Sequence, residues 1–240
     1  MKIALIGYGA MGKLIERLAA SENHEIAVVI DESNADLSAL ELSEKLRGVV
    51  DAAIDFSIAG AVRKNVEASI LANVPLVEGT TGWNSEIENI KKIVVENNGA
   101  FVYGANFSIG VNLFYRIVNF SSELFARFED YEAFLEEQHH SRKKDAPSGT
   151  ALKLKAIIAE HIKKEFSVSS TRAGNIPGTH RVGFDAAADQ ILLEHTARSR
   201  EGFASGALFA ARWIVGKKGV FEFSDIMNEI LKTEKSDVNS

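Results

Sequence analysis

Residues 136–151 concentrate reactive side chains in one short stretch, reading Glu-Glu-Gln-His-His-Ser-Arg-Lys-Lys-Asp-Ala-Pro-Ser-Gly-Thr-Ala. Histidine and lysine can transfer protons, and three consecutive cations can hold an anionic substrate. The Pro-Ser-Gly-Thr run predicts the start of a helix, where unpaired backbone N–H groups bind carboxylates or phosphates. Together these features predict a reaction site for a small acidic molecule.

The two adjacent histidines must have different roles if the strand that precedes them extends that far, because neighbouring strand residues point to opposite faces. His139 shares its face with Ala133 and Leu135, whereas His140 shares its face with Phe134. This periodicity does not decide which face borders a cleft. Adjacent histidines rarely bind one ion and no cysteine is available, so we predict no metal site.

The residues around the predicted helix start supply candidate contacts for carboxylates. Arg142 and Lys144 are cations, and Ser148, Gly149 and Thr150 offer backbone N–H groups and two hydroxyls. The alternative is that Ser148 or Thr150 only caps the helix, beside structural histidines and a solvated basic run. Capping does not explain the cations that precede the helix, so we favour an anion site.

A second motif lies at the N-terminus, where Gly7-Tyr8-Gly9-Ala10-Met11-Gly12 follows a predicted strand and opens a predicted helix. In a dinucleotide-binding turn the first glycine permits the tight turn, the second admits the pyrophosphate and the third allows close helix packing. Asp31 ends the next predicted strand, 19 residues after Gly12, where a carboxylate can bind an adenosine ribose. The motif predicts a nicotinamide or flavin dinucleotide rather than a simple glycine-rich turn. Asp31 favours NADH over NADPH, because a 2′-phosphate would meet like charge, but both remain open.

Three further loops follow predicted strands, where open α/β sheets bind ligands. They are Asp55-Phe56-Ser57, Gly79-Thr80-Thr81-Gly82 and Gly104-Ala105-Asn106-Phe107. Each could be ordinary loop chemistry, but the series predicts a cofactor-binding rim.

The first hundred residues alternate strand and helix patterns, which predicts a Rossmann-type parallel sheet with helices on both faces. The predicted strands are Lys2–Ile6, Glu25–Ile30, Val49–Phe56, Val74–Glu78 and Ala100–Tyr103, and the helices are Ala10–Ala20, Ala61–Ala72 and Ser85–Glu96. We assign residues 1–107 to a dinucleotide-binding domain.

After Asn106 the pattern changes to consecutive strands with few helices, which predicts a C-terminal α+β domain with a mixed or mostly antiparallel sheet. The predicted strands are Tyr131–His140, Val168–Arg172, Thr179–Ala187 and Gln190–Ala197, and the helices are Val111–Phe128, Thr150–Lys164, Phe203–Val215 and Asp225–Lys232. We assign residues 108–212 to this second domain, and we expect the polar tail Thr233–Ser240 to be frayed.

The composition excludes several classes of protein. The 240 residues are 46% hydrophobic and 25% charged, typical of a globular protein. A net charge of −6 argues against nucleic-acid binding, and the absence of cysteine excludes disulfides, thiolate nucleophiles and Cys-ligated zinc. No run is long enough for a membrane span or a signal peptide, so we expect a cytoplasmic protein.

The run from His139 to Ala151 resembles the H-H-x-x-K-x-D-A-P-S-G-T-A signature of the 4-hydroxy-tetrahydrodipicolinate reductase (dihydrodipicolinate reductase) family. Further segments resemble that family in the same order and extend the match over nearly the whole chain. These are the glycine turn, Asp55–Ser57, Gly79–Gly82, Asn106–Asn112 and Arg172–His180.

The resemblance implies NAD(P)H-dependent reduction of a cyclic dicarboxylate in the diaminopimelate route to lysine. It implies His139 as a proton donor or acceptor, Lys143 as a proton donor, and His140, Gly149 and Thr150 as substrate contacts. It also implies a homotetramer formed through the C-terminal sheet, and a C-terminal segment, residues 213–240, that packs back on the cofactor domain. Two alternatives are another two-domain oxidoreductase of a small anionic substrate and a non-catalytic dinucleotide sensor.

Overall fold

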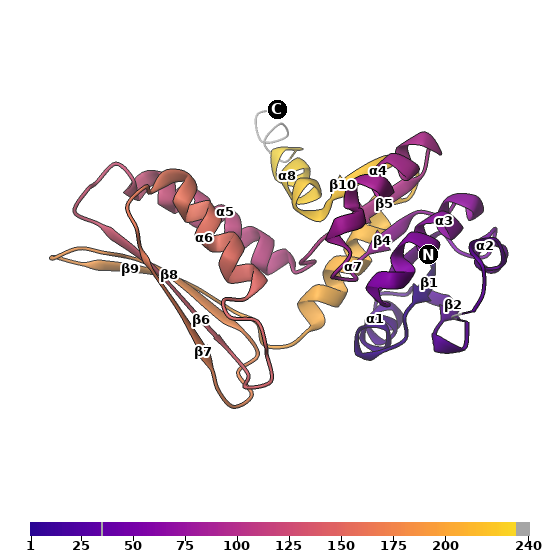
Figure 1. Cartoon of the computed structure of the whole chain (residues 1–240), viewed down its shortest axis with the longest axis horizontal. Coiled ribbons are helices and arrows are strands. Elements are labelled where there is room, and N and C mark those ends of the chain that lie inside the picture. The colour runs from indigo at the N-terminus through magenta and orange to yellow at the C-terminus, as the bar shows by residue number, and fades with distance from the viewer. Residues whose placement is uncertain (35, 234–240) are drawn as a thin grey trace. The chain divides into compact units, whose positions relative to one another are not determined.

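The structure, a computed structural model, describes residues 1–34 and 36–233, which form two compact units (Figure 1). Unit 1 combines Met1–Ser108 with the chain from Glu201 onward, and unit 2 is the continuous segment Ile109–Arg200. The change of pattern near residue 107 therefore coincides with the first boundary between the units.

Unit 1 is built on a six-stranded parallel sheet with the strand order β10-β5-β4-β3-β1-β2. Its strands are β1 (Lys2–Ile6), β2 (Glu25–Ile30), β3 (Ala52–Asp55), β4 (Leu76–Glu78), β5 (Ala100–Tyr103) and β10 (Gly219–Glu222). Ile3 and Leu5 on one face of β1, and Ala4 and Ile6 on the other, are all buried. Both faces of the sheet are therefore covered, as a parallel sheet requires, and the predicted Rossmann-type fold is confirmed.

The described part of unit 1 contains six α-helices, and Figure 1 shows them around this sheet. They are α1 (Ala10–Ser21), α2 (Ala39–Leu46), α3 (Val62–Ala72), α4 (Ile87–Glu96), α7 (Glu201–Ile214) and α8 (Phe223–Thr233), with short 3₁₀ turns at Glu32–Asn34, Ala59–Ala61 and Asn84–Glu86. Helix α7 contacts α1 and strands β3, β4 and β5, while α3 contacts β3, β4, α2 and α4.

The predicted boundary at residue 212 is wrong, because α7 belongs to unit 1. Its small side chains Ala204, Ala207 and Ala211 are fully buried, which lets the helix lie close to the sheet. The chain then adds β10, which pairs in parallel with β5, and α8. The described residues beyond 213 belong to unit 1. Of the tail Thr233–Ser240, which we expected to be frayed, all but the first residue lie outside the described residues.

Unit 2 contains a four-stranded mixed sheet with the order β7-β6-β8-β9, in which only β6 and β7 are parallel. Its elements are α5 (Ile109–Phe125), β6 (Glu132–His139), α6 (Gly149–His161), β7 (Ser167–Arg172), β8 (Thr179–Asp185) and β9 (Gln190–Thr196). Phe114 of α5 and Leu154 of α6 pack on Leu135, Val182 and Phe184 of the sheet. One face of the sheet is thus covered by both helices. No helix in the described ranges is long and apolar enough to cross a membrane.

Candidate active site

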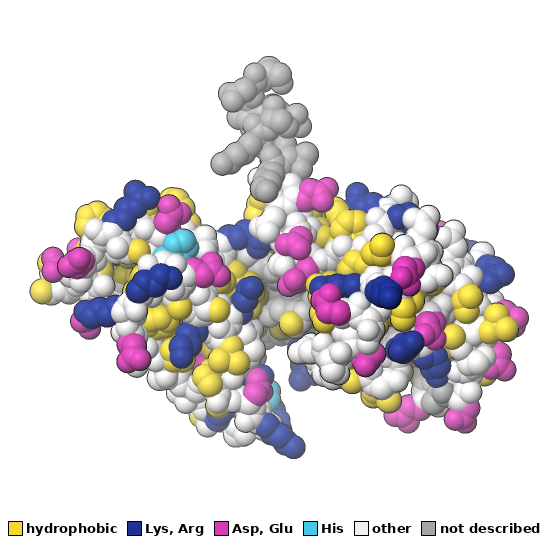
Figure 2. All heavy atoms as spheres, turned by 45° about the horizontal axis from the view of Figure 1, so that its top comes forward, with side chains coloured by type: hydrophobic (Ala, Val, Ile, Leu, Met, Phe, Trp, Pro, Cys, Tyr) yellow, Lys and Arg dark blue, Asp and Glu magenta, His cyan; other side chains and the backbone are white. Residues whose placement is uncertain are grey.

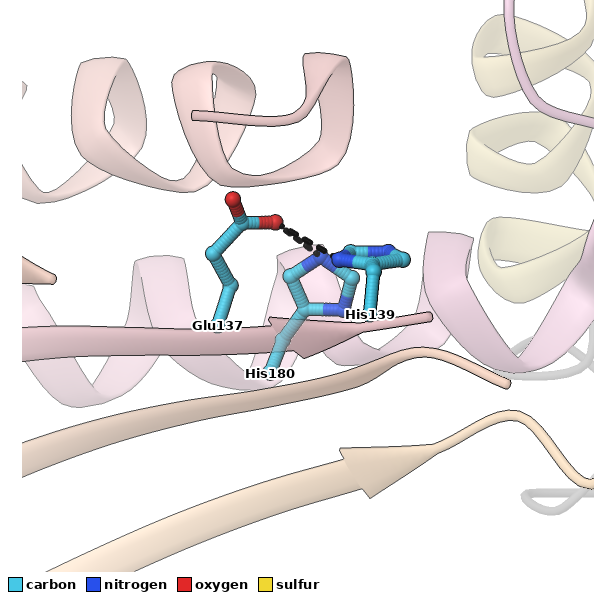
Figure 3. Close-up of side chains that lie close together, drawn as sticks. All are labelled: Glu137, His139 and His180. Carbon is cyan, nitrogen blue, oxygen red and sulfur yellow. Dashed lines mark ion pairs between the residues drawn. The ribbon is translucent and has the colours of Figure 1, made fainter. Parts of the chain in front are cut away.

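The end of β6 carries two reactive side chains on the buried face of the unit 2 sheet. Residues of β6 alternate in burial, so that Glu137 and His139 share the covered face with Leu135. Figure 3 shows Glu137 and His139 from β6 beside His180 from β8. The Oε2 atom of Glu137 lies 3.0 Å from His139 Nδ1 and 3.8 Å from His180 Nε2, and the two imidazole rings are 5.2 Å apart. His139 therefore lies on the covered face of the sheet, with its ring beside Glu137.

Glu137 is held by three donors on its other oxygen. Oε1 accepts the backbone N–H of Ser148 at 3.0 Å, the hydroxyl of Ser170 at 2.8 Å and Arg172 Nη2 at 2.6 Å. Burial raises the pKa of Glu137, but these hydrogen bonds more than offset it and lower the pKa to about 2. Glu137 is therefore a fixed, buried carboxylate.

Both histidines of this cluster have a lowered pKa, which favours the uncharged imidazole. Burial lowers the pKa of His139, an effect that Glu137 partly reverses and the cations of Lys143 and Arg172 reinforce. Burial, followed by the neighbouring His139, lowers the pKa of His180 to about 4. Neutral imidazoles can accept a proton as well as donate one, which suits proton transfer.

This cluster should make the free energy of unfolding fall on acidification. His180 has a folded pKa of about 4, below its ordinary 6.5, so its protonation favours the unfolded state as the pH falls from 6.5 to about 4. Glu137 stabilises the fold above pH 4.5, and that stabilisation is lost towards pH 2. Across its own pH range, each group should lower the free energy of unfolding by on the order of 3 kcal/mol as the pH falls. Denaturant unfolding measured from pH 7 to pH 4 should therefore show a progressive loss, which His180→Gln should reduce.

The same exchange outside the cluster, His161→Gln, provides the control and should leave the acid sensitivity of wild type unchanged. If the His180→Gln variant lost stability as steeply as wild type between pH 6.5 and pH 4, protonation of His180 would not be the cause.

The loop after β6 carries the three predicted cations, of which Lys143 acts electrostatically on His139. Lys143 Nζ pairs with Asp145 Oδ1 at 2.8 Å, and the Lys143 ammonium lowers the pKa of that carboxyl group. Arg142 donates to Asn175 Oδ1 at 3.0 Å, and Lys144 is exposed. His140 directly follows β6 and is half-buried. The predicted donor Lys143 thus has its ammonium in a fixed position within unit 2.

The start of α6 differs in one respect from the prediction. Ser148 is the N-cap of α6, and its hydroxyl accepts the N–H of Ala151 and lies 3.2 Å from His180 Nε2. Its own N–H donates to Glu137. Ser148 is therefore buried, and its N–H and hydroxyl groups are both hydrogen-bonded within the protein. The expectation of a free N–H at this residue is wrong. Gly149 is exposed and Thr150 half-buried at the first turn, where they remain candidates for anion binding.

The ligand atoms of Glu137, His139 and His180 lie within 4.8 Å of one another, a spacing that a metal ion could occupy. Arg172 already places a guanidinium 2.6 Å from the same carboxylate. The positive charge of Arg172 would repel a metal ion bound to this carboxylate, so we interpret the cluster as a proton-transfer site.

In unit 1 the glycine turn connects β1 to α1. Gly7 has φ +87°, and a Cβ atom on it would lie 2.4 Å from Phe56 O, while one on Gly12 would lie 2.3 Å from Gly7 O. A Cβ atom on Gly9 would meet nothing within 4 Å. Gly9 is the N-cap of α1 and provides no side-chain hydrogen bond to the first N–H groups of the helix. This arrangement fits a dinucleotide pyrophosphate.

The other predicted cofactor residues all follow the carboxyl ends of neighbouring parallel strands, so they lie along one edge of the sheet. Asp31 follows β2, Phe56 follows β3, Gly79, Thr80 and Thr81 follow β4, and Gly104, Ala105, Asn106 and Phe107 follow β5, while Ala10 and Met11 begin α1. Asp31 accepts two hydrogen bonds from Ser33, and these lower the pKa of its carboxyl group. Phe107 is 2% exposed and its ring packs on Phe223 at 4.8 Å, so its side chain belongs to the core.

Two buried acids fix these loops: Asp55, which belongs to a predicted rim loop, and Glu78, to which the sequence analysis gave no role. Asp55 Oδ1 accepts the N–H of Ser57 at 2.8 Å, and Glu78 Oε1 accepts the N–H of Thr80 at 2.7 Å. Asp55 and Glu78 are paired across β3 and β4. Burial raises the pKa of both, and that of Glu78 is well above its usual range because Asp55 adds its charge. Burial therefore favours the protonated form of both acids.

Sequence reasoning also gave no role to Glu137, Arg172 or His180. A signal for Glu137 exists in the sequence, because it lies on the same face of β6 as Ala133 and Leu135. A charged residue among apolar residues of one strand face needs a partner when that face is buried. The partners come from β7 and β8, and no local pattern identifies them.

Comparisons with known proteins agree with these observations. Residues 1–107 match the family model of the dihydrodipicolinate reductase N-terminus, and residues 110–227 match that of its C-terminus. A 4-hydroxy-tetrahydrodipicolinate reductase from Christiangramia forsetii is 37% identical over 246 residues, which cover 97% of this chain and 100% of the relative. One from Methanoregula boonei is 34% identical over 260 residues, covering 98% of this chain and 99% of the relative.

Among solved structures, a dihydrodipicolinate reductase from Paenisporosarcina sp. TG-14 with dipicolinate bound has the same fold. Its TM-score is 0.78 at 22% identity, covering 94% of this chain and 99% of that one. A probable dehydrogenase from Thermotoga maritima gives a TM-score of 0.61 at 8% identity, covering 95% of this chain and 92% of that chain. The two-part family match and the near full-length relatives show that this chain belongs to the dihydrodipicolinate reductase family.

Proposed function

We propose that this protein catalyses the NAD(P)H-dependent reduction of 4-hydroxy-tetrahydrodipicolinate to tetrahydrodipicolinate, a step of diaminopimelate and lysine biosynthesis. The observation that carries the proposal is the proton-transfer cluster of unit 2, in a chain whose relatives over nearly full length have this name. A dinucleotide sensor would have no use for a buried Glu-His-His cluster beside a basic loop.

The residues of unit 1 would hold the cofactor. The α1 N-terminus at Gly9 would bind the pyrophosphate, Asp31 the ribose, and the loops after β3, β4 and β5 the nicotinamide end. When bound, the reduced nicotinamide supplies the hydride. Because Asp31 is an exposed carboxylate, we propose a preference for NADH over NADPH, with both accepted.

The residues of unit 2 would bind the dicarboxylate and move a proton. Arg142 and Lys144 are exposed cations, and Gly149 and Thr150 begin α6, so these groups suit the two carboxylates. Loss of the 4-hydroxyl as water and arrival of hydride at C4 leave an enamine, whose ring carbon must take a proton. Lys143 or His139 delivers it.

A coupled assay tests this proposal. Pyruvate and aspartate semialdehyde are condensed by the preceding synthase, and nicotinamide absorbance is followed after this protein is added. We expect oxidation of both cofactors, faster with NADH. Matched assays with aldehydes and sugars lacking two carboxylates should stay at background. No oxidation of either cofactor by the condensation product would exclude the proposed reaction.

We also propose that the protein is a homotetramer formed through the unit 2 sheet, and that it is cytoplasmic. The face of the sheet opposite α5 and α6 carries Phe134 over Gly183, beside Leu192, which is 47% exposed. Paired charges of Glu136, Arg181 and Glu194 lie on the same face. A face that combines apolar side chains with charges of both signs is suited to a second copy of itself. Sedimentation analysis should give four times the chain mass, and a monomer at micromolar concentration would contradict the assembly.

A further inference from the structure

We propose that Glu137 is a positioning residue of the reaction. It accepts the Nδ1–H of His139 and so leaves His139 Nε2 as the nitrogen that exchanges a proton with the substrate. This inference rests on the proposed function, and it gives a role to a buried carboxylate that is not among the predicted site residues.

The two oxygens of Glu137 have different surroundings. Oε1 is saturated by Ser148, Ser170 and Arg172, which fix the carboxylate plane. Among the described residues, Oε2 has no such donor, and it lies 3.0 Å from His139 Nδ1 (Figure 3). The residue is 1% exposed, so water does not replace the missing donor. The carboxylate is therefore held on one side and available to an imidazole on the other.

His139 Nδ1 and Glu137 Oε2 are each buried and, within the described part of the chain, make no hydrogen bond of good angular geometry. The pair is at hydrogen-bond distance, 3.0 Å, although its N–H···O geometry falls short of a good hydrogen bond. Because a buried polar atom needs a partner, each of these atoms is best satisfied by the other. The neighbouring His180 is not a competitor, since its Nε2 is 3.8 Å from Oε2 and bonds to Ser148 Oγ.

Accepting the Nδ1–H selects one tautomer of His139. A carboxylate can only accept a hydrogen bond, so the ring proton must be on Nδ1 and the lone pair on Nε2. The anion also stabilises the protonated ring, against the opposing effects of burial, Lys143 and Arg172. The other groups around the ring are Asp145, whose charge acts in the same direction as Glu137, and the neutral His180.

Glu137→Gln tests the proposal, because the amide oxygen can still accept from Arg172 while its NH₂ faces His139. The NH₂ group would force the opposite tautomer, with the proton on Nε2. We expect kcat to fall about 10²-fold with little change in KM, the scale of a lost proton-transfer group. The limb of the pH–kcat profile that reports His139 should move to lower pH. Glu136→Gln is the matched control, since Glu136 lies on the opposite face of β6, and it should leave kcat and the profile unchanged.

A double-mutant cycle separates positioning from a structural role. In a His139→Asn background, Glu137→Gln should lower kcat by at most about twofold, because the residue through which it acts is absent. If the two losses multiplied, Glu137 would act independently of His139 and the proposal would be overturned. The wild-type protein is assayed in parallel and shows whether the proposed reaction occurs at all. Failure of the proposed reaction is thereby distinguished from failure of the positioning role of Glu137.

A measurement on the wild-type protein keeps the proposal testable if the Gln variant does not fold. Imidazole ¹⁵N shifts at neutral pH, in the absence of substrate, distinguish the two tautomers of His139. We expect a protonated Nδ1 and an unprotonated Nε2. A protonated Nε2 would overturn the proposal whatever the enzyme activity proves to be.

Discussion

Replacing Lys143 with alanine should lower kcat for dicarboxylate reduction by ~10²–10⁴-fold, the typical contribution of a positioned general acid. The ammonium group is held by Asp145 at 2.8 Å, in a loop of unit 2, whereas the predicted cofactor residues are in unit 1. NADH binding should therefore survive. Steady-state kinetics in the coupled assay and a fluorescence titration of NADH measure the two quantities separately.

Two further lysine variants make this result specific. Lys155→Ala removes an exposed lysine from α6 and should leave kcat unchanged. Lys143→Arg keeps the positive charge but not a proton that can be released, since guanidinium stays protonated at all working pH values. We expect this variant to remain as slow as Lys143→Ala. Recovery to near the wild-type kcat would mean that Lys143 supplies charge alone and that the proton comes from elsewhere.

Gly9→Val should weaken NADH binding by about 10-fold or more, corresponding to 1–3 kcal/mol of steric cost, without lowering the stability of the protein. The reason is that a Cβ atom at Gly9 meets nothing within 4 Å, and its φ of −80° lies outside the left-handed region. A ligand bound at the α1 N-terminus would meet the added side chain. Equilibrium titration measures the affinity of the variant for NADH, and denaturant unfolding measures its free energy of unfolding.

Gly12→Val is the contrasting variant, because its Cβ atom would lie 2.3 Å from Gly7 O. It should lower the free energy of unfolding by about 1–3 kcal/mol or more through the backbone shift that it forces. Wild-type NADH affinity in the Gly9→Val variant would show that the pyrophosphate does not bind at this helix.

The sequence predicts most of unit 1, because a parallel sheet buries both faces of its strands and leaves continuous apolar runs between turns. Prediction from the sequence fails for elements that are short or that lack a clear hydrophobic pattern. Helix α2 has only eight residues, and its capping box of Ser38 and Glu41 is visible only once a helix is suspected. Strand β10 is four residues long and half-exposed at the sheet edge. The pattern of α7 shows a helix, but the elements that it contacts, α1 and strands β3 to β5, all lie in the first half of the chain.

For the site, the sequence identifies residues on contiguous motifs and misses those that tertiary structure adds. His139 and Lys143 belong to one recognisable run. Arg172 and His180 reach Glu137 from β7 and β8, and their role depends on which strands are neighbours in the sheet. The free N–H expected at Ser148 was predicted from the helix start alone. It is occupied because a carboxylate from β6 lies opposite it.

The assembly of unit 1 from two distant parts of the chain has a consequence for biosynthesis on the ribosome. Until residues 201–233 emerge, β5 has no β10 beside it and β3 to β5 lack the cover of α7. Unit 2 is one continuous segment with its own core, so it can complete its folding while unit 1 still lacks its C-terminal segment. Nascent chains arrested near residue 200 should therefore present an open strand edge and bare apolar strands, which are the features that chaperones bind and that lead to aggregation.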